Sequence, residues 1–198
     1  MDRYDELLRT DVYGIAVNKA SVAHIYLTKE QACAADDDGV HAAITADNSE
    51  DTVVDDEFTN PPYPRNLTIT PGGTTGDVKK SDIVVEGTNI KDEPITETFS
   101  FEANATTATV GNKAFKTVTK VTIPAQDGAG ATFTIGWGDK LGLPFKISGK
   151  PLVFALHNGV PETTAPTLAT DDDEIEKNTI DLNSALHNDK SVDIYLFL

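Results

Sequence analysis

The chain has 198 residues, of which 39% are hydrophobic and 7% aromatic, and it contains one cysteine, Cys33. This length can bury one substantial core or two small ones, and a single cysteine excludes a fold held together by intramolecular disulfides. The formal net charge of −16 argues against direct binding to nucleic acid, because neutralising phosphates requires clustered Lys and Arg.

The first nine residues predict one or two helical turns anchored by Leu7 and Leu8. The same stretch carries acids where a secretion signal has a basic start and an apolar run, and no segment approaches the roughly 20 apolar residues of a membrane span. We therefore expect a protein that is made and kept in a soluble compartment, with no membrane partner.

Two similar β-prone stretches lie near the ends of the chain. Residues 21–28 read SVAHIYLT and residues 191–196 read SVDIYL, both rich in β-branched and aromatic residues. A similarity this short does not indicate a domain repeat, but it is compatible with the two ends supplying similar strands to one sheet.

Two acidic stretches hold most of the excess charge. Residues 30–57 contain ten acids and residues 162–176 contain six, with no Lys or Arg in either, whereas residues 65–150 are close to neutral. We interpret both stretches as solvated loops or as an extended arm. The two Asp triplets are candidate cation ligands, although neither has the spacing of an EF-hand loop: Asp36, Asp37, Asp38, Asp171, Asp172 and Asp173.

A proline-rich segment at residues 60–64 resembles a linker into a β domain, because each proline fixes its own φ and disfavours helix before it. Short strands separated by turn signals then follow at regular spacing, which is typical of a sandwich or barrel. The expected strands are 67–70, 83–86, 95–101, 115–123, 132–137 and 152–156.

Details within this region predict faces and turns. Phe133, Ile135 and Trp137 alternate with small residues and should face inward, while the alternation slips after Phe115, which indicates a bulge or a strand that begins later. Turns are expected at residues 111–112 and, as a hairpin, at residues 128–130.

Four segments of this region carry a family resemblance: EGTN at 86–89, ITETF at 95–99, NKAFKTVT at 112–119 and GDKLGLP at 138–144. Together they resemble a pattern found in small structural proteins of tailed-virus particles, chiefly head decoration (auxiliary capsid) proteins. The resemblance spans residues 82–147, about a third of the chain.

The resemblance implies a β-rich virion subunit that is made in the host cytoplasm and assembled on the capsid surface. Its partner would be the major capsid protein, and it would form a homo-oligomer, most often a trimer. Proteins of this type are not enzymes and need no cofactor, so the pattern carries no catalytic residue to this chain.

The residues themselves give no support to an enzyme. The four histidines are scattered, and neither a zinc spacing, a nucleophile elbow, a phosphate loop nor a dinucleotide fingerprint occurs. Two alternatives stay open: a phage tail or neck subunit, and a β-sandwich module that binds carbohydrate or cell surfaces. The second would use Trp137, Tyr63 and Tyr195 for stacking, although core packing is the better interpretation of Trp137.

These observations predict an all-β protein, a β-sandwich or barrel-like domain with long acidic loops and a short N-terminal helical turn. Its segments would be 1–64, with N-terminal strands, an acidic arm and a linker; 65–157, the sandwich core; and 158–198, an acidic loop and a returning strand.

Overall fold

Antiparallel strands make up about half of residues 22–197, the part of the chain that this computed structural model describes. Within that part there is no α-helix, only the two 3-10 turns η1 (Thr75–Asp77) and η2 (Ile175–Lys177). The prediction of an all-β fold is confirmed. The expected helical turn at residues 1–9 lies outside the described residues.

The strands form three sheets. Sheet A has the order β1-β14-β10-β11, built from β1 (Val22–Leu27), β14 (Val192–Phe197), β10 (Leu152–His157) and β11 (Val160–Pro161). Sheet B has the order β12-β13-β9-β4-β7, with β2 also on β9; its strands are β12 (Thr167–Ala169), β13 (Thr179–Asp181), β9 (Ala131–Gly142), β4 (Arg65–Gly73), β7 (Thr109–Phe115) and β2 (Asp36–Thr45). Sheet C has the order β3-β8-β5-β6, from β3 (Thr52–Val54), β8 (Thr117–Ile123), β5 (Ser81–Thr88) and β6 (Pro94–Phe101).

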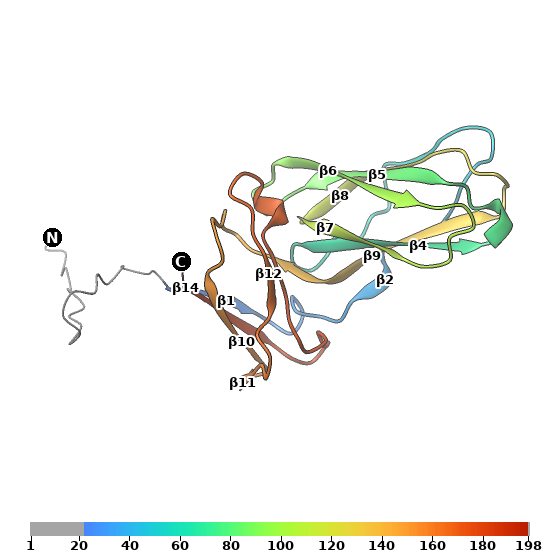
Figure 1. Ribbon diagram of the computed structural model, residues 1–198. Coiled ribbons are helices and arrows are strands. Elements are labelled where there is room, and N and C mark those ends of the chain that lie inside the picture. Colours follow the sequence, from blue (N-terminus) through green and yellow to red (C-terminus); the bar gives the residue numbers. More distant parts are fainter. Residues whose placement is uncertain (1–21, 198) are drawn as a thin grey trace, which may run out of the picture.

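Sheets B and C pack face to face as a sandwich, and sheet A lies at the other end of the molecule (Figure 1). The sandwich core joins Leu67 and Phe133 of sheet B to Ile83 and Phe99 of sheet C, all at most 1% exposed. A second core lies under sheet A and includes Leu143 and Ile194. Burial of apolar area in these two cores supplies the main driving force for the fold.

Strand β9 belongs to both cores. Its first half turns Phe133, Ile135 and Trp137 into the sandwich core, as the alternation predicts, and Leu141 near its end packs in the second core. The slip after Phe115 is also explained, since β7 ends there and β8 begins at Thr117. The segment boundaries at 64/65 and 157/158 remain predictions.

The two similar end stretches are neighbours. β1 and β14 pair antiparallel over their whole length, from Val22 opposite Phe197 to Leu27 opposite Val192. A strand near each end of the chain is therefore needed to complete sheet A.

The first acidic stretch is only in part the loop that its charge predicts. Residues 36–45 form β2, which pairs with β9 while exposing its three aspartates. Close approach depends on two glycines, since a Cβ on Gly136 would lie 1.9 Å from the Asp36 carbonyl oxygen and one on Gly39 would lie 2.6 Å from the Trp137 ring. Two register shifts break the alternation of β2, so the strand leaves no period-two signal in the sequence.

One predicted turn is wrong, and a second is a turn as predicted but not a hairpin. Gly111 and Asn112 lie inside β7, and residues 128–130 join β8 of sheet C to β9 of sheet B rather than two strands of one hairpin. Both glycines leave room for a neighbouring carboxylate. A Cβ on Gly111 would lie 2.7 Å from Glu97 Oε2, and one on Gly128 would lie 2.3 Å from the Asp77 side chain. Local sequence cannot distinguish a glycine that makes a turn from one that admits a neighbour.

Candidate docking surface

The outer face of sheet A is an uncovered apolar surface among residues 22–197. Three rows cross β1, β14 and β10 in register, and they consist of Val22–Phe197–Leu152, His24–Tyr195–Phe154 and Tyr26–Asp193–Leu156. The exposed fractions are high for such residues: Val22 56%, Tyr26 56%, Leu152 69%, Phe154 44% and Phe197 41%. We call these nine residues the sheet A face.

The opposite side of the same strands explains why this face exists. Ile25, Ile194 and Ala155 point inward onto the second core, so the strands are apolar on both faces. Strands of this composition are usually covered on both sides. A contiguous exposed apolar patch is a candidate interaction surface.

One polar pair lies in the middle of the sheet A face. His24 Nε2 is 2.8 Å from Asp193 Oδ1, and the His24 ring stacks on Tyr195 with centroids 4.4 Å apart and planes at 4°. Phe154 continues this row at 6.2 Å from Tyr195. The only carboxylate of the face therefore has a partner already.

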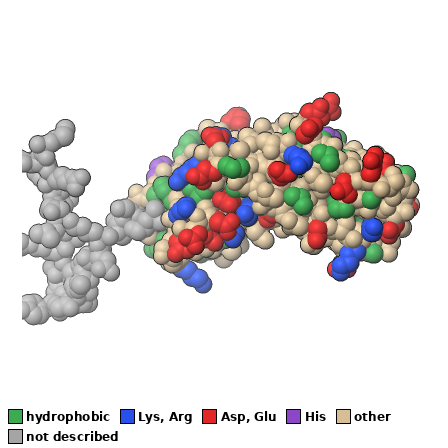
Figure 2. Space-filling model, turned by 90° about the horizontal axis from the view of Figure 1, so that it is seen from above, with side chains coloured by type: hydrophobic (Ala, Val, Ile, Leu, Met, Phe, Trp, Pro, Cys, Tyr) green, Lys and Arg blue, Asp and Glu red, His purple; other side chains and the backbone are tan. Residues whose placement is uncertain are grey.

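Charged side chains are spread over the molecule, but few of them lie on the sheet A face itself. Figure 2 shows acidic side chains scattered along the length of the molecule, with fewer basic ones between them. Residues 36–142 carry eighteen acids and eight Lys or Arg, a net −10 by subtraction, which is most of the formal −16. The acidic excess thus lies in the sandwich and in residues 162–176, whereas the nine residues of the sheet A face include one carboxylate, Asp193.

The three aromatic residues proposed for carbohydrate stacking do not come together. Trp137 is 8% exposed in the sandwich core and donates from Nε1 to the Ala34 carbonyl at 3.2 Å, which confirms the core interpretation. Tyr63 is partly buried against the second core, where its hydroxyl donates to the Gly142 carbonyl at 2.9 Å, and burial raises its pKa to about 12. Of the three, Tyr195 alone lies on the sheet A face.

The two Asp triplets lie on different elements. Asp36, Asp37 and Asp38 are exposed on β2, and a hydrogen bond with Asp36 raises the pKa of Asp38. Asp171 Oδ1 instead accepts the backbone N–H groups of Asp173 at 2.9 Å and Glu174 at 2.7 Å, and these bonds lower its pKa. Among residues 22–197 no group of three or more His, Cys, Asp or Glu side chains is arranged to hold a metal ion.

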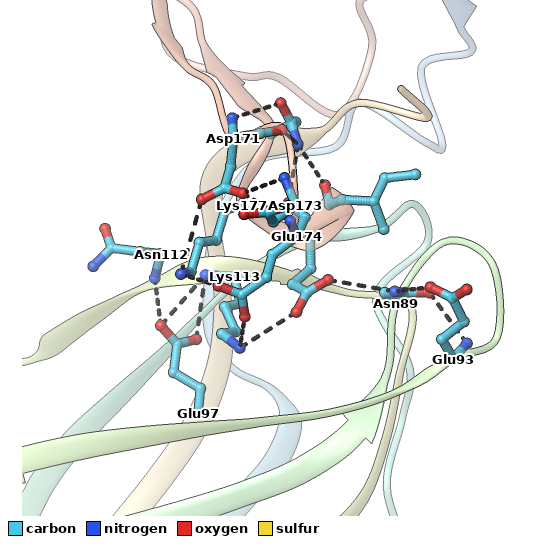
Figure 3. Close-up of polar contacts among 12 residues, drawn as sticks. Asn89, Glu93, Glu97, Asn112, Lys113, Asp171, Asp173, Glu174 and Lys177 are labelled. Atoms are coloured by element: carbon cyan, nitrogen blue, oxygen red, sulfur yellow. Dashed lines mark hydrogen bonds and ion pairs between the residues drawn. The ribbon is translucent and has the colours of Figure 1, made fainter. Parts of the chain in front are cut away.

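An ion-paired junction ties the second acidic stretch to the sandwich (Figure 3). Lys113 Nζ on β7 donates to Glu174 at 3.0 Å and to Glu176 at 3.3 Å, and Asn89 donates to the other oxygen of Glu176 at 3.4 Å. Burial opposes the charge on Lys113, but the two carboxylates outweigh it and raise its pKa. This stretch is therefore partly a packed contact rather than solvated loop.

A hollow of about 350 Å³ lies beside this junction, where β7, β9, β12 and β13 meet. It is lined by Asn112, Lys140, Thr167, Ala169, Thr170, Asp171, Lys177, Thr179 and Asp181. Its charged groups are mostly engaged with their neighbours, since Lys140 donates to Asn112 at 2.9 Å and Lys177 pairs with Glu174. The hollow holds no set of groups that indicates a reaction.

Sequence reasoning missed the sheet A face, although a signal was present. Apolar residues occupy all but one position in each of residues 22–27, 152–157 and 192–197, rather than alternate positions only, which indicates strands without a solvent face. The linker interpretation of residues 60–64 also overlooked contacts there, such as the Asn60 Oδ1 that accepts the Val118 N–H at 2.9 Å.

Comparison with known proteins found no relative: no protein-family model, no curated protein and no solved structure matches this chain. No helix among the described residues is long and apolar enough to cross a membrane.

Proposed function

We propose that this protein is a non-enzymatic structural subunit of a virion, which decorates or stabilises the head of a tailed virus. It binds the major capsid protein on the capsid surface through the sheet A face, after synthesis in the host cytoplasm. It works by burying surface and needs no cofactor.

The observation that carries this proposal is the uncovered sheet A face at one end of an acidic molecule. Docking by this face removes its aromatic and aliphatic side chains from water, and such side chains in the centre of an interface dominate binding energy. The acidic sandwich then projects from the shell, where like charge keeps neighbouring particles apart. A shell repeats each contact many times, so a modest single contact suffices.

A carbohydrate-binding module is the alternative that this face favours next, because Tyr26, Phe154 and Tyr195 place three aromatic rings on the same face of sheet A. Sugar recognition also needs polar groups that fix hydroxyls, and the face offers only the His24–Asp193 pair, which is already hydrogen bonded. Protein docking therefore accounts for more of the surface than sugar stacking does.

Binding to expanded empty shells tests the proposal. The wild-type protein should cosediment with shells and raise their melting temperature by mass action. The variants Leu152→Glu and Phe154→Glu should each weaken binding to shells by at least about tenfold, because each places a charge in a surface that loses its water on docking. Val53→Glu is the matched control. It adds the same charge at an exposed apolar residue (Val53, 52% exposed) on β3 of the sandwich, away from the sheet A face.

The outcomes separate the candidate functions. Shell binding that Phe154→Glu abolishes and Val53→Glu leaves intact supports head decoration. Equal binding by all variants, or no binding by the wild type, overturns it. Hundreds of copies in purified particles would agree with a head protein, six or twelve would indicate the neck or tail, and retention on a glycan column without shell binding would indicate the carbohydrate module.

A further inference from the structure

The edges of the three sheets differ in how they are protected. β11 has two residues and ends in Pro161, and β3 and β12 have three residues each. β2 is interrupted by two register shifts and exposes three aspartates, and β6 and β7 lie against each other through Glu97. Short strands, proline, bulges and charge are the features by which sheet edges avoid pairing with other chains.

β1 has none of these features. It runs for six residues with the sequence VAHIYL and pairs with β14 in unbroken register. It contains no Pro, Lys, Arg, Asp or Glu, and on its other side no strand from residues 22–197 pairs with it. An edge of this length and composition is a template for a further strand.

We propose that β1 pairs antiparallel with β1 of a second copy of this chain, so that two sheets A join into one eight-stranded sheet. Residues directly opposite each other in an antiparallel pair lie on the same face of the sheet. We place His24 at the two-fold axis, so that Val22 of each copy lies beside Tyr26 of the other and the two sheet A faces become continuous.

The β1 edge is where charge least opposes contact with a second copy. Each chain carries a formal −16, so two copies repel one another wherever carboxylates would meet. The β1 edge is where copies can meet without a carboxylate in either strand, and the nearby Asp193 is paired with His24. Identical edges are also self-complementary about a two-fold axis, as an isologous contact requires.

The size of the contact sets its strength. A stable interface buries about 800 Å² on each partner, and one pair of six-residue strands buries less than that. We therefore expect a weak dimer whose population rises with concentration. Because residues 22–197 of each copy present one such edge, the contact closes at two copies, so this edge produces a dimer rather than the trimer expected from the family resemblance.

Sedimentation equilibrium of the full chain over a wide concentration range, without shells, tests this inference independently of the proposed function. Wild type should show a monomer–dimer equilibrium. Val22→Lys/Tyr26→Lys should raise its dissociation constant by at least about tenfold, because four lysines then meet across the axis. Val22→Lys/Tyr26→Glu should associate as well as wild type or better, since each Lys then lies beside a Glu of the other copy.

Val160→Lys is the matched control, because Val160 is 65% exposed on β11, the opposite edge strand of the same sheet. It should leave the dissociation constant unchanged, and the melting temperature of every variant should stay near that of wild type. The inference is overturned if wild type remains monomeric, if Val160→Lys weakens association as much as the double lysine variant, or if the Lys/Glu variant fails to recover it.

Discussion

At the scale of single residues, the junction around Lys113 shows how a charge can be buried without being left alone. Glu176 is only 7% exposed, yet it accepts hydrogen bonds from both Lys113 and Asn89. Two hydrogen bonds lower the pKa of the neighbouring Glu174, the larger effect coming from Lys177 and the smaller from Lys113. Five side chains from three distant parts of the sequence thus satisfy one another.

Replacing Lys113 should be costly because it leaves the Glu176 carboxylate buried and without its cation. We expect Lys113→Met to lower the free energy of unfolding by about 3 to 5 kcal/mol in urea titrations. Lys80→Met is the control: its pair with Glu102 is 71% and 79% exposed, and its loss should cost less than about 1 kcal/mol. The double variant Lys113→Met/Glu176→Gln should recover much of the lost stability. If Lys113→Met and Lys80→Met lowered the free energy of unfolding equally, this account of the junction would be contradicted.

At the scale of elements, one side of the sandwich is closed by a side chain rather than by a strand pair. Glu97 on β6 accepts the backbone N–H groups of Asn112 at 2.7 Å and Lys113 at 3.3 Å on β7. Burial raises the pKa of Glu97, and these two hydrogen bonds oppose that effect only in part. Gly111 is required beside it because any side chain would displace the carboxylate.

This arrangement predicts a pH dependence. A carboxyl group whose pKa is raised on folding makes the protein less stable as pH rises through its unfolded and then its folded pKa. Glu97→Gln keeps an oxygen acceptor without the charge, so its stability relative to wild type should be higher at pH 7 than at pH 4. Glu97→Ala should lose about 1 to 3 kcal/mol at either pH, because two N–H groups lose their acceptor. Urea unfolding at both pH values measures this, and a Gln variant whose relative stability falls with rising pH would refute it.

At the scale of the whole molecule, the two cores are joined through shared elements. β9 packs in both, and the buried Arg65 of β4 donates from its guanidinium to the carbonyls of Cys33 and Gln31, each at 3.0 Å, in the connection that follows β1. Neither core can lose its structure without disturbing β9. The described chain should therefore unfold as one cooperative unit.

Calorimetry tests this cooperativity. Wild type should show one transition with equal calorimetric and van't Hoff enthalpies. Ile135→Ala in the sandwich core and Ile194→Ala in the second core should each lower that same transition, with a loss of about 2 to 5 kcal/mol. Two transitions, each moved by only one of the variants, would show that the cores are independent.

The sequence alone determined the strand chemistry. Residues 67–70, 83–86, 95–101, 132–137 and 152–156 all lie in strands, because β-branched and aromatic residues with turn signals between them are local properties. Inward alternation likewise placed Phe133, Ile135 and Trp137 in the core. The acidic excess and the scarcity of catalytic motifs were also evident from residue types.

Tertiary structure decided what each segment packs against. β2 can pair with β9 because Gly136 leaves room for the β2 backbone. Glu97 closes one side of the sandwich because the β7 backbone lies within hydrogen-bond distance of its carboxylate. Lys113 forms an ion pair with Glu176, which is 63 residues away in the sequence. The sheet A face exists because strands near both ends of the chain meet in register and nothing among residues 22–197 covers them. Such contacts depend on distances between residues far apart in sequence, which periodicity and composition do not encode.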